Sequence, residues 1–597
     1  MSRKGKKRKS YNKNKFKKIS ILLLLLVLII LIGICFVFPK NDTPILKKET
    51  IKDMYLASNV NTVSIFELQE EVNDENPEES NQVLVEIEED IARGIEVKVK
   101  SKKIEYEGEE YQLILIDDNE YYTNTSNLVQ EVEDVVLEEV IYVRSTTSVL
   151  ESIESSKIVG LASKGEGLEV VGYEELQSDG SINLYKVKLG DKEGFIYGKY
   201  TTFTKEAATK NYMADVYDPI HSKVKNSYGG GEAINLDFYP NEKPNFDNNK
   251  MPDSVYALYL NCGTNTINNI DAYIEFAKST NINAFVVDIK DNESPAYPAK
   301  TFELLSPANY SHAINSYESY KNAITKLKEA GFYVIGRITV FKDSFYVQDH
   351  PEHAIIDKTT GNAYLHNGSY WPSAYNRDVW YYTVSLAKEA VQEFGFHEIN
   401  FDYVRFPDRM NSVADKVDLK NIYNEDKAQA IQRFVQYASD ALHELEAYVS
   451  IDVFGESTNG TYTTAYGQYW PAISNVADVI CGMPYPDHFS AGSYGLSKPW
   501  NNPYQLMYYW GSYANDRQKE IPTPAKARTW IQAYDVMKYV DRNGISYGAK
   551  EVEQEIRGLY ESGLNGGYIT WLSNSSLEKY KSQANAFRID YWKEYNE

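Results

Sequence analysis

One unit, an apolar strand followed by a loop and an amphipathic helix, occurs eight times between residue 254 and the C-terminus. Residues 314–331 show the helical period clearly, because Tyr317, Tyr320, Ile324 and Leu327 fall on one face. Eight strands alternating with helices predict an α/β fold, specifically a (β/α)8 TIM barrel. A doubly wound open sheet is the alternative, but no Gly-rich phosphate loop follows the first strand. The expected strands are residues 255–261, 283–291, 332–341, 397–406, 447–455, 477–486, 527–535 and 566–573.

The N-terminal end has a different character. Residues 1–18 contain ten Lys or Arg and no acidic residue, and residues 19–38 are apolar and uncharged throughout. Such a run is long enough to span a bilayer, whereas a cleaved signal peptide has a shorter apolar region ending in small residues. Basic residues before the span keep the N-terminus in the cytoplasm. We therefore expect a single-pass protein of the cell membrane, with everything after the transmembrane helix outside.

The remaining chain is acidic, with 52 basic residues against 85 acidic ones. An acidic body repels nucleic acid, so we expect no nucleic-acid partner. Beyond the span, Cys262 and Cys481 are the only cysteines, and two cysteines so far apart indicate neither a disulfide framework nor a metal site. We expect no cofactor.

Composition divides the region before the barrel into three parts. Residues 39–92 are rich in acids and poor in aromatics, which predicts a solvated stalk. Residues 93–204 contain short alternating runs separated by Gly-containing turns, which predict a β-rich region. Residues 205–253 are rich in Gly, Pro and Asn, which predicts a linker to the domain at 254–597.

Residues 139–204 resemble bacterial SH3-like domains through "YVRS", "KGEGLEVVG" and "KEGFIYGKYTT". The resemblance implies a small all-β barrel, and in that family such modules commonly bind cell-wall material. A simple spacer is the alternative interpretation.

Asp402 lies in "GFHEINFDYVRFPD", an apolar and aromatic run that otherwise reads as a buried strand. Strand residues alternate in direction, so Asn400 and Asp402 point into the barrel while Ile399, Phe401 and Tyr403 point to the helices. A buried carboxylate is costly without partners, so Asp402 belongs either to a structural ion pair or to a site. Acids recur near the ends of five strands, which favours a site because active sites of this fold collect there.

Paired carboxylates among aromatics suit glycoside hydrolysis, in which one acid protonates the leaving oxygen and another attacks the anomeric carbon or activates water. The candidate catalytic residues are Asp402, Asp452 and Glu456. The candidate substrate-binding residues are Asp288, Lys290, Arg337, Arg405, Tyr485, Asp487, His488, Gln532, Asp535 and Trp571. Aromatic residues expected in loops over the site are Tyr370, Trp371, Tyr375, Trp470, Tyr485 and Trp500.

The segment from about residue 254 to 590 contains, in this order, the motifs "VVDIKD", "GRITVFKD", "HPEHAI", "GFHEINFDYVRFP", "SIDVFG", "GMPYPDHFSAGSYG", "WIQAYD" and "GGYITWLS". Through these motifs it closely resembles a bacterial glycosyl hydrolase domain family related to the α-amylase-like (β/α)8 hydrolases. The resemblance implies that Asp402 is the nucleophile and that an acid of the fifth strand donates the proton. Asp452 is favoured for that role and Glu456 is its rival.

These observations predict a membrane-anchored extracellular glycoside hydrolase acting on a cell-envelope or secreted polysaccharide. A catalytically silent carbohydrate-binding protein and a polysaccharide deacetylase are the alternatives. His350 and His353 lack the helical spacing of metal-binding pairs, so we expect no metal and interpret them as loop caps. Retention or inversion at the anomeric carbon stays open.

Overall fold

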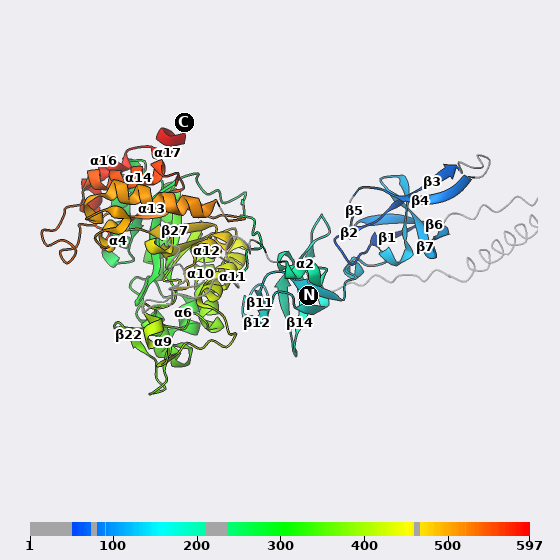
Figure 1. Ribbon diagram of the computed structural model, residues 1–597, viewed down its shortest axis with the longest axis horizontal. Helices are drawn as coiled ribbons and strands as arrows, with labels where there is room; N and C mark the ends of the chain where they lie inside the picture. The colour runs from blue at the N-terminus through cyan, green and yellow to red at the C-terminus, as the bar shows by residue number, and fades with distance from the viewer. Residues whose placement is uncertain are drawn as a thin grey trace, which may run out of the picture. The chain divides into compact units, whose positions relative to one another are not determined.

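The computed structural model describes residues 51–72, 80–89, 91–210, 212, 236–458, 466–519 and 521–596 (Figure 1). The expected basic tail and transmembrane helix lie outside these residues. No helix within the described ranges is both long and apolar enough to cross a membrane. The chain divides into two compact units, of which the larger contains residues 55–64, 88–95 and 126–597.

The expected acidic stalk is wrong for much of its length, because three of its segments form strands of a seven-stranded sheet ordered β4-β3-β8-β7-β6-β1-β9. Its acids alternate with apolar residues such as Leu68 and Leu84, which pair across neighbouring strands. The acids of the described strands therefore lie on the polar face of a sheet and do not mark an unfolded segment. The strands are β1 (Lys52–Leu56), β3 (Phe66–Val72), β4 (Ser80–Glu86), β6 (Glu96–Tyr106), β7 (Glu109–Ile116), β8 (Asn119–Asn124) and β9 (Leu128–Val129).

A second seven-stranded sheet, ordered β12-β11-β15-β14-β13-β10-β16, occupies the range expected for the SH3-like domain. Its neighbouring strands are all antiparallel, and its core includes Ile141, Val149, Val187 and Ile196. An N-terminal β-region is thus present, and its kinship with SH3-like domains stays a prediction. The strands are β10 (Val140–Val143), β11 (Thr147–Leu150), β12 (Ile158–Ala162), β13 (Gly167–Leu176), β14 (Ile182–Leu189), β15 (Lys192–Tyr197) and β16 (Thr201–Thr202).

The expected linker is only partly described and is partly packed. A short helix, α2 (Lys205–Thr209), begins it. Further along, Leu236 and Phe238 are buried against Tyr469 and Ala472 of the barrel domain. These two apolar side chains, together with hydrogen bonds from Asn241 to Thr523 and from Lys243 to the Ser474 carbonyl, hold this segment against the barrel, although its Gly, Pro and Asn content had predicted a free connection.

The barrel prediction is confirmed in its main features: all eight expected strands are present and form a nearly closed parallel barrel. The seventh strand is interrupted at Arg528, so that one half pairs with the sixth strand and the other with the eighth. The strands are β17 (Val255–Leu260), β18 (Ala284–Asp291), β20 (Tyr333–Thr339), β24 (Glu398–Asp402), β26 (Tyr448–Phe454), β27 (Val479–Met483), β28 (Lys526–Ala527), β29 (Thr529–Gln532) and β30 (Gly567–Trp571).

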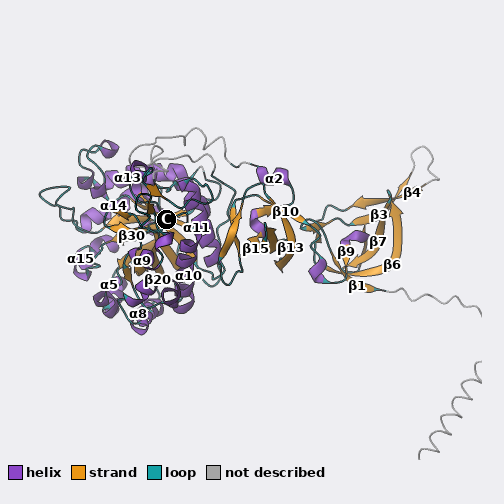
Figure 2. Ribbon diagram, turned by 90° about the horizontal axis from the view of Figure 1, so that it is seen from below, coloured by secondary structure: helices purple, strands orange, loops and turns teal. Residues whose placement is uncertain are grey.

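Helices surround the strands, and their apolar faces form the main core with the outward side chains of the barrel (Figure 2). Helix α10 shows the local signals plainly, since the Asn376 side chain caps its first amides and Gly395, at φ 65°, ends it. The longer helices are α5 (Ile270–Lys278), α8 (Tyr317–Glu329), α10 (Arg377–Phe394), α11 (Lys427–His443), α13 (Pro503–Gln518) and α14 (Ala549–Glu561). The shorter ones are α4 (Thr264–Asn268), α6 (Lys300–Leu305), α7 (Pro307–Ser311), α9 (Ser344–Asp349), α12 (Trp470–Val476), α15 (Leu577–Ser582), α16 (Ala584–Phe587) and α17 (Tyr591–Asn596).

Inside the barrel a separate cluster of side chains fills the space between the strands, including Tyr259, Val286, Ile335 and Trp530. The interior is therefore a packed core and not a channel, as is usual for this architecture. Polar side chains enter this core at three heights along β24, and only the highest reaches a cavity.

Candidate functional site

The site begins with the inward face of β24, which carries Glu398, Asn400 and Asp402 at every second position. All three side chains are buried. The strand ends at Asp402, because Tyr403 adopts the left-handed conformation with φ 52°, which is uncommon for an aromatic residue. The Tyr403 amide donates to Oδ1 of Asp402 at 2.6 Å, so the turn that ends the strand also fixes the carboxylate.

Arg337 of β20 is the central cation of the site. Its guanidinium donates to Oδ2 of Asp402 at 2.6 Å, to Oδ1 of Asp288 at 2.7 Å and to Oδ1 of Asp291 at 3.1 Å. Arg337 is 1% exposed, so these ion pairs lie in a poorly hydrated place. Burial, which Arg337 only partly offsets, raises the pKa of Asp288 to about 7.

Asp452 of β26 lies at the same end of the barrel and is fully buried. Its Oδ1 accepts from Nδ2 of Asn400 at 2.8 Å and from Nε1 of Trp530 at 2.7 Å. Its other oxygen, Oδ2, is buried and has no hydrogen-bond partner among the described residues. Burial, reinforced by the neighbouring Asp402 carboxylate, raises the pKa of Asp452 well above its ordinary value. The raised pKa suits Asp452 to a role in which a carboxyl group holds its proton at a pH where an ordinary Asp has lost it.

Arg337, Asp402 and Asp452 line one cavity of about 260 Å³ at the carboxyl ends of the strands. Its charged lining consists of Asp291, Asp402, Asp452, Arg337 and Arg405. Its aromatic lining consists of Tyr403, Phe454, Tyr485, Trp530 and Trp571. The cavity thus combines two inward carboxyl groups with ring faces that suit the apolar faces of sugars.

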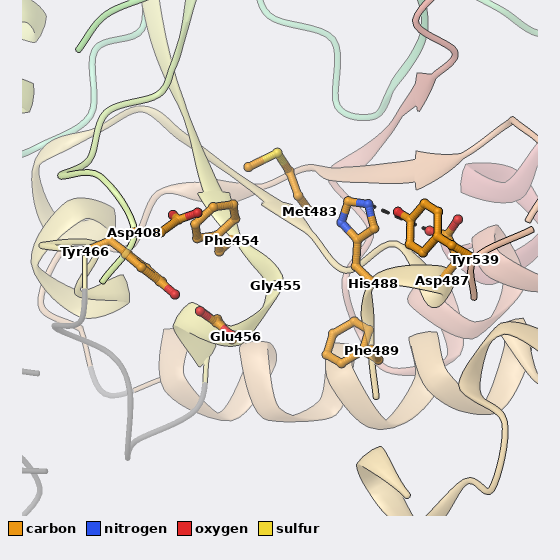
Figure 3. Close-up of a pocket in the computed structure, with 10 residues that line it drawn as sticks. All are labelled: Asp408, Phe454, Gly455, Glu456, Tyr466, Met483, Asp487, His488, Phe489 and Tyr539. Atoms are coloured by element: carbon orange, nitrogen blue, oxygen red, sulfur yellow. Dashed lines mark ion pairs between the residues drawn. The ribbon is translucent and has the colours of Figure 1, made fainter. Parts of the chain in front are cut away.

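A second pocket of about 380 Å³ lies beside this cavity, and the two share Phe454, Met483 and His488. Glu456 lines the second pocket and not the first. In Figure 3, Glu456 lies near Asp408 and Tyr466, opposite His488 and Asp487. The two rival acids of the fifth strand therefore occupy different pockets, because strand β26 ends between them.

Some predicted residues serve the site from behind. Asp288 does not line the cavity but supports Arg337, and the Tyr259 hydroxyl donates to it. Gln532 is buried and accepts from the Asp487 amide at 3.3 Å, so it joins two βα loops. Arg405 lines the cavity, pairs with Asp408 at 3.0 Å and faces several aromatic rings.

Two further predicted binding residues also lie outside both pockets. Lys290 is buried but pairs with Asp343 at 3.0 Å, because a register shift after Asp288 turns it away from the cavity. Asp535 is exposed, and its carboxylate accepts from Lys579 and from the Tyr547 amide.

Of the six aromatic residues expected over the site, only Tyr485 lines the cavity. Trp371 packs against Arg405 of the cavity wall, with its ring centroid 5.1 Å from the Arg405 guanidinium carbon. Tyr375, Trp470 and Trp500 pack within the domain, and Tyr370 lies on the exposed hairpin of β22 (Leu365–His366) and β23 (Ser369–Tyr370).

Sequence reasoning missed several residues of the cavity. Trp530 was hidden in an apolar strand, although its alternation with Arg528 and Gln532 marks it as inward. Met483 and Phe454 carry no chemical signal by themselves, since apolar residues at strand ends are common. Asn292 follows Asp291 directly and was overlooked beside it.

His350 and His353 lie in the loop between β20 and α10, together with Glu352. They line neither pocket. Both cysteines beyond the expected span, Cys262 and Cys481, are buried and free.

Solved structures from three organisms are among those similar to the chain. A hypothetical protein from Ruminiclostridium thermocellum ATCC 27405 is 29% identical, with 33% of this chain and 97% of that chain covered and a TM-score of 0.28. The glycoside hydrolase domain of PgaB (BpsB) from Bordetella bronchiseptica is 12% identical, with 57% of this chain and 100% of that chain covered and a TM-score of 0.42. The β-amylase catalytic domain of Paenibacillus polymyxa is 11% identical, with 58% and 98% covered and a TM-score of 0.36.

No curated protein matches the chain in sequence. A family model does match, over residues 256–577, which include all eight barrel strands and both inward carboxyl groups of the cavity. This range is more than half of the chain. The chain belongs to the family described as "Putative glycosyl hydrolase domain".

Proposed function

We propose that the barrel hydrolyses glycosidic bonds of a polysaccharide, with Asp452 as the proton donor and Asp402 as the nucleophile. The observation that carries the proposal is the Oδ2 atom of Asp452, which is buried, unpartnered among the described residues and part of a residue lining the cavity. A carboxyl group with a raised pKa and a free oxygen is suited to protonate a leaving group.

The first step uses both carboxyl groups. Asp452 gives its proton to the glycosidic oxygen as the bond from that oxygen to the anomeric carbon breaks. One oxygen of Asp402 then forms a bond to the anomeric carbon, giving a covalent glycosyl intermediate. In the second step the Asp452 carboxylate takes a proton from water, and the water oxygen displaces Asp402.

Arg337 and the Tyr403 amide hold Asp402 in place for this attack. Together they bind both of its oxygens, at 2.6 Å each. A carboxylate fixed in this way loses little orientational freedom on reaching the transition state. The same contacts allow a second geometry, in which Asp402 activates water and the anomeric configuration inverts; the configuration of the first-formed product separates the two.

Ring faces around the cavity suit a carbohydrate. Tyr403, Tyr485 and Trp571 line it beside the two carboxyl groups. Flat apolar faces of sugar rings pack on such side chains, while the hydroxyl groups meet the charged lining. A polysaccharide is therefore the substrate class we propose.

We further propose that this polysaccharide belongs to the cell envelope or is secreted, and that the protein is anchored in the cell membrane by residues 19–38. The support is the sequence alone: a charge-free apolar run directly after ten basic residues. Cell-wall binding by residues 139–204 is part of the same proposal. Protease added to intact cells should remove the barrel and leave a short basic stub, whereas recovery of the full-length chain from cytosol alone contradicts the topology.

The decisive experiment measures turnover and melting temperature together on a panel of cell-wall and exopolysaccharide fragments. Asp402→Asn and Asp452→Asn should abolish cleavage while glycan binding and fold persist, and Glu456→Gln should retain cleavage. A folded Asp402→Asn variant with unchanged hydrolysis removes the nucleophile assignment. A wild-type protein that binds glycans but cleaves none supports the catalytically silent carbohydrate-binding barrel instead.

A further inference from the structure

A second cluster of chemically active side chains lies in the loop between β20 and α10, outside both pockets. His350 caps the start of the short 3-10 helix η4 (Pro351–His353), His353 ends it, and Glu352 lies between them. His350, Glu352 and His353 each place one nitrogen or oxygen atom within 4.8 Å of the other two. Asp378, from the first turn of α10, borders this group, with its Oδ2 3.5 Å from Nε2 of His353.

The backbone explains why the two histidines come together. Side chains three residues apart eclipse each other on a 3-10 helix, whereas an α-helix brings positions three and four apart only into rough proximity. The rings of His350 and His353 accordingly stack, with centroids 5.1 Å apart and planes inclined by 9°. Spacing that looked wrong for an α-helical metal site is therefore right for a 3-10 turn.

Three of the distances between the candidate ligand atoms match the edges of a metal tetrahedron. Zinc bonds to nitrogen and oxygen of about 2.0 to 2.2 Å place neighbouring ligand atoms about 3.3 to 3.6 Å apart. Glu352 Oε1 lies 3.4 Å from Nδ1 of His350 and 3.6 Å from Nε2 of His353. Asp378 Oδ2 lies 3.5 Å from the same Nε2. All three separations exceed ordinary charge-assisted hydrogen bonds, which are about 2.7 to 2.9 Å long.

The outer nitrogens have the partners that a metal-binding histidine needs. Nε2 of His350 lies 2.9 Å from the Leu305 carbonyl oxygen, which only accepts, so this nitrogen carries the hydrogen and Nδ1 presents its lone pair to Glu352. Nδ1 of His353 lies 2.9 Å from the Tyr346 hydroxyl. When Nδ1 donates to that hydroxyl, Nε2 presents its lone pair to the two carboxylates, and a cation between them stabilises this arrangement.

We propose that His350, Glu352 and His353 bind one divalent transition-metal ion, and that Asp378, whose side chain is 63% exposed, turns in as the fourth ligand. Zn²⁺ is the best fit to two imidazoles and two carboxylates. Four protein ligands make a closed site, which is typical of a structural role. The ion would tie η4 to the start of α10. Both carboxylates are more than half exposed, so the ion enters directly from solvent.

This tie reaches the candidate active site through the backbone. The carbonyl of His353 accepts from the Ser373 amide at 2.9 Å, and the Ile355 amide donates to the Trp371 carbonyl at 3.0 Å. Trp371 in turn backs Arg405 in the cavity wall. The bound ion therefore stabilises the segment that holds one wall of the cavity, although it takes no part in the proposed reaction.

Metal titration of the full chain, freed of metal with EDTA and exchanged into fresh buffer, tests the proposal directly. We expect one Zn²⁺ per chain by calorimetry, and with Co²⁺ the visible absorption of a four-coordinate site. His353→Asn and Glu352→Gln should each weaken Zn²⁺ binding at least about tenfold. His312→Asn, a matched change at an exposed histidine outside the cluster, should bind as the wild type does.

Glu352 is exposed, so Glu352→Gln keeps the test valid if the histidine variant fails to fold. Zn²⁺ should also raise the melting temperature and slow amide hydrogen exchange across residues 344–376 in the wild type but not in Glu352→Gln. Stoichiometry and affinity that are the same in Glu352→Gln, or no binding by the wild type, overturn the proposal. Neither readout depends on glycan cleavage.

Discussion

Arg337 and Arg528 are both buried inside the same barrel, and both pair with an acid of β24, yet only one of them borders a cavity. Arg528 donates to Glu398 at 2.6 Å, and both side chains are 0% exposed. Arg337 serves Asp402, Asp288 and Asp291 together. The two acids of β24 lie four residues apart on one face, about 13 Å along the strand.

The contrast shows what distinguishes a structural ion pair from a site. At the amino end of β24 one cation meets one carboxylate, the Tyr333 hydroxyl donates to the same carboxylate, and the surroundings are packed. At the carboxyl end one cation meets three acids, a fourth carboxyl group retains an unpartnered oxygen, and a cavity opens. Buried charge alone is therefore weak evidence of function; an excess of acids beside open space is stronger evidence.

The largest effect is expected for Asp452→Asn, which removes a carboxyl group from the cavity without changing the shape of the side chain. Asn can still accept from Asn400 and Trp530 but has no proton to give, so turnover should fall about 10³- to 10⁴-fold. Wild-type turnover should also decline as pH rises through the raised pKa of Asp452. Kinetics across pH on a cleaved glycan would check both effects, and a folded variant with more than a tenth of wild-type turnover would contradict the acid assignment.

The next largest effect is expected for Arg528→Met, which breaks the structural ion pair with Glu398 at the amino end of β24. The change leaves Glu398 buried without its cation, which costs about 3 to 5 kcal/mol of unfolding free energy. Denaturant titration measures this loss. Adding Glu398→Leu should restore much of the stability, and turnover per folded molecule should stay near the wild-type value in both variants. A large loss of turnover in the folded fraction would show that the Arg528–Glu398 ion pair and the cavity are not independent.

A smaller, pH-dependent effect is expected for Asp288→Asn. The pKa of Asp288 rises from its ordinary value near 4 when unfolded to about 7 when folded, so the protonated side chain favours the folded state. This contribution is complete below about pH 4 and is lost as pH rises to about 7, by at most about 4 kcal/mol. The Asn side chain stays neutral at every pH, as protonated Asp is. Unfolding free energies of wild type and variant should therefore lie close together below about pH 4 and draw apart as pH rises to about 7, where only the wild type loses stability, and parallel curves would rule the effect out.

Glu456→Gln should have the smallest effect, because its pocket adjoins the reacting cavity without containing the two inward acids. We expect a change of less than about tenfold in KM, with kcat nearly unchanged, as for a contact to a remote part of the substrate. Steady-state kinetics on long and short oligosaccharides would resolve it. A loss of kcat comparable with that of Asp452→Asn would instead make Glu456 the proton donor.

Periodicity carried the fold prediction far. Alternation at two residues placed Asn400 and Asp402 inward, and the helical period separated the strands correctly. The same reasoning failed for the acidic segment before the second sheet, because its high charge density obscures the alternation of apolar and polar residues in β3 and β4. Lys290 was misplaced as well, since a register shift in β18 breaks the alternation locally and no sequence signal announces it.

The sequence by itself determined the barrel, the inward direction of Asp402 and the concentration of acids at strand ends, because these follow from short-range periodicity. Only the tertiary structure decided which acids share a cavity. Asp452 owes its raised pKa to burial beside Asp402 and its free oxygen to the positions of Asn400 and Trp530, which come from other strands. Such contacts join residues up to 78 positions apart, and pattern along the chain contains no record of them because they depend on how the strands close around one core.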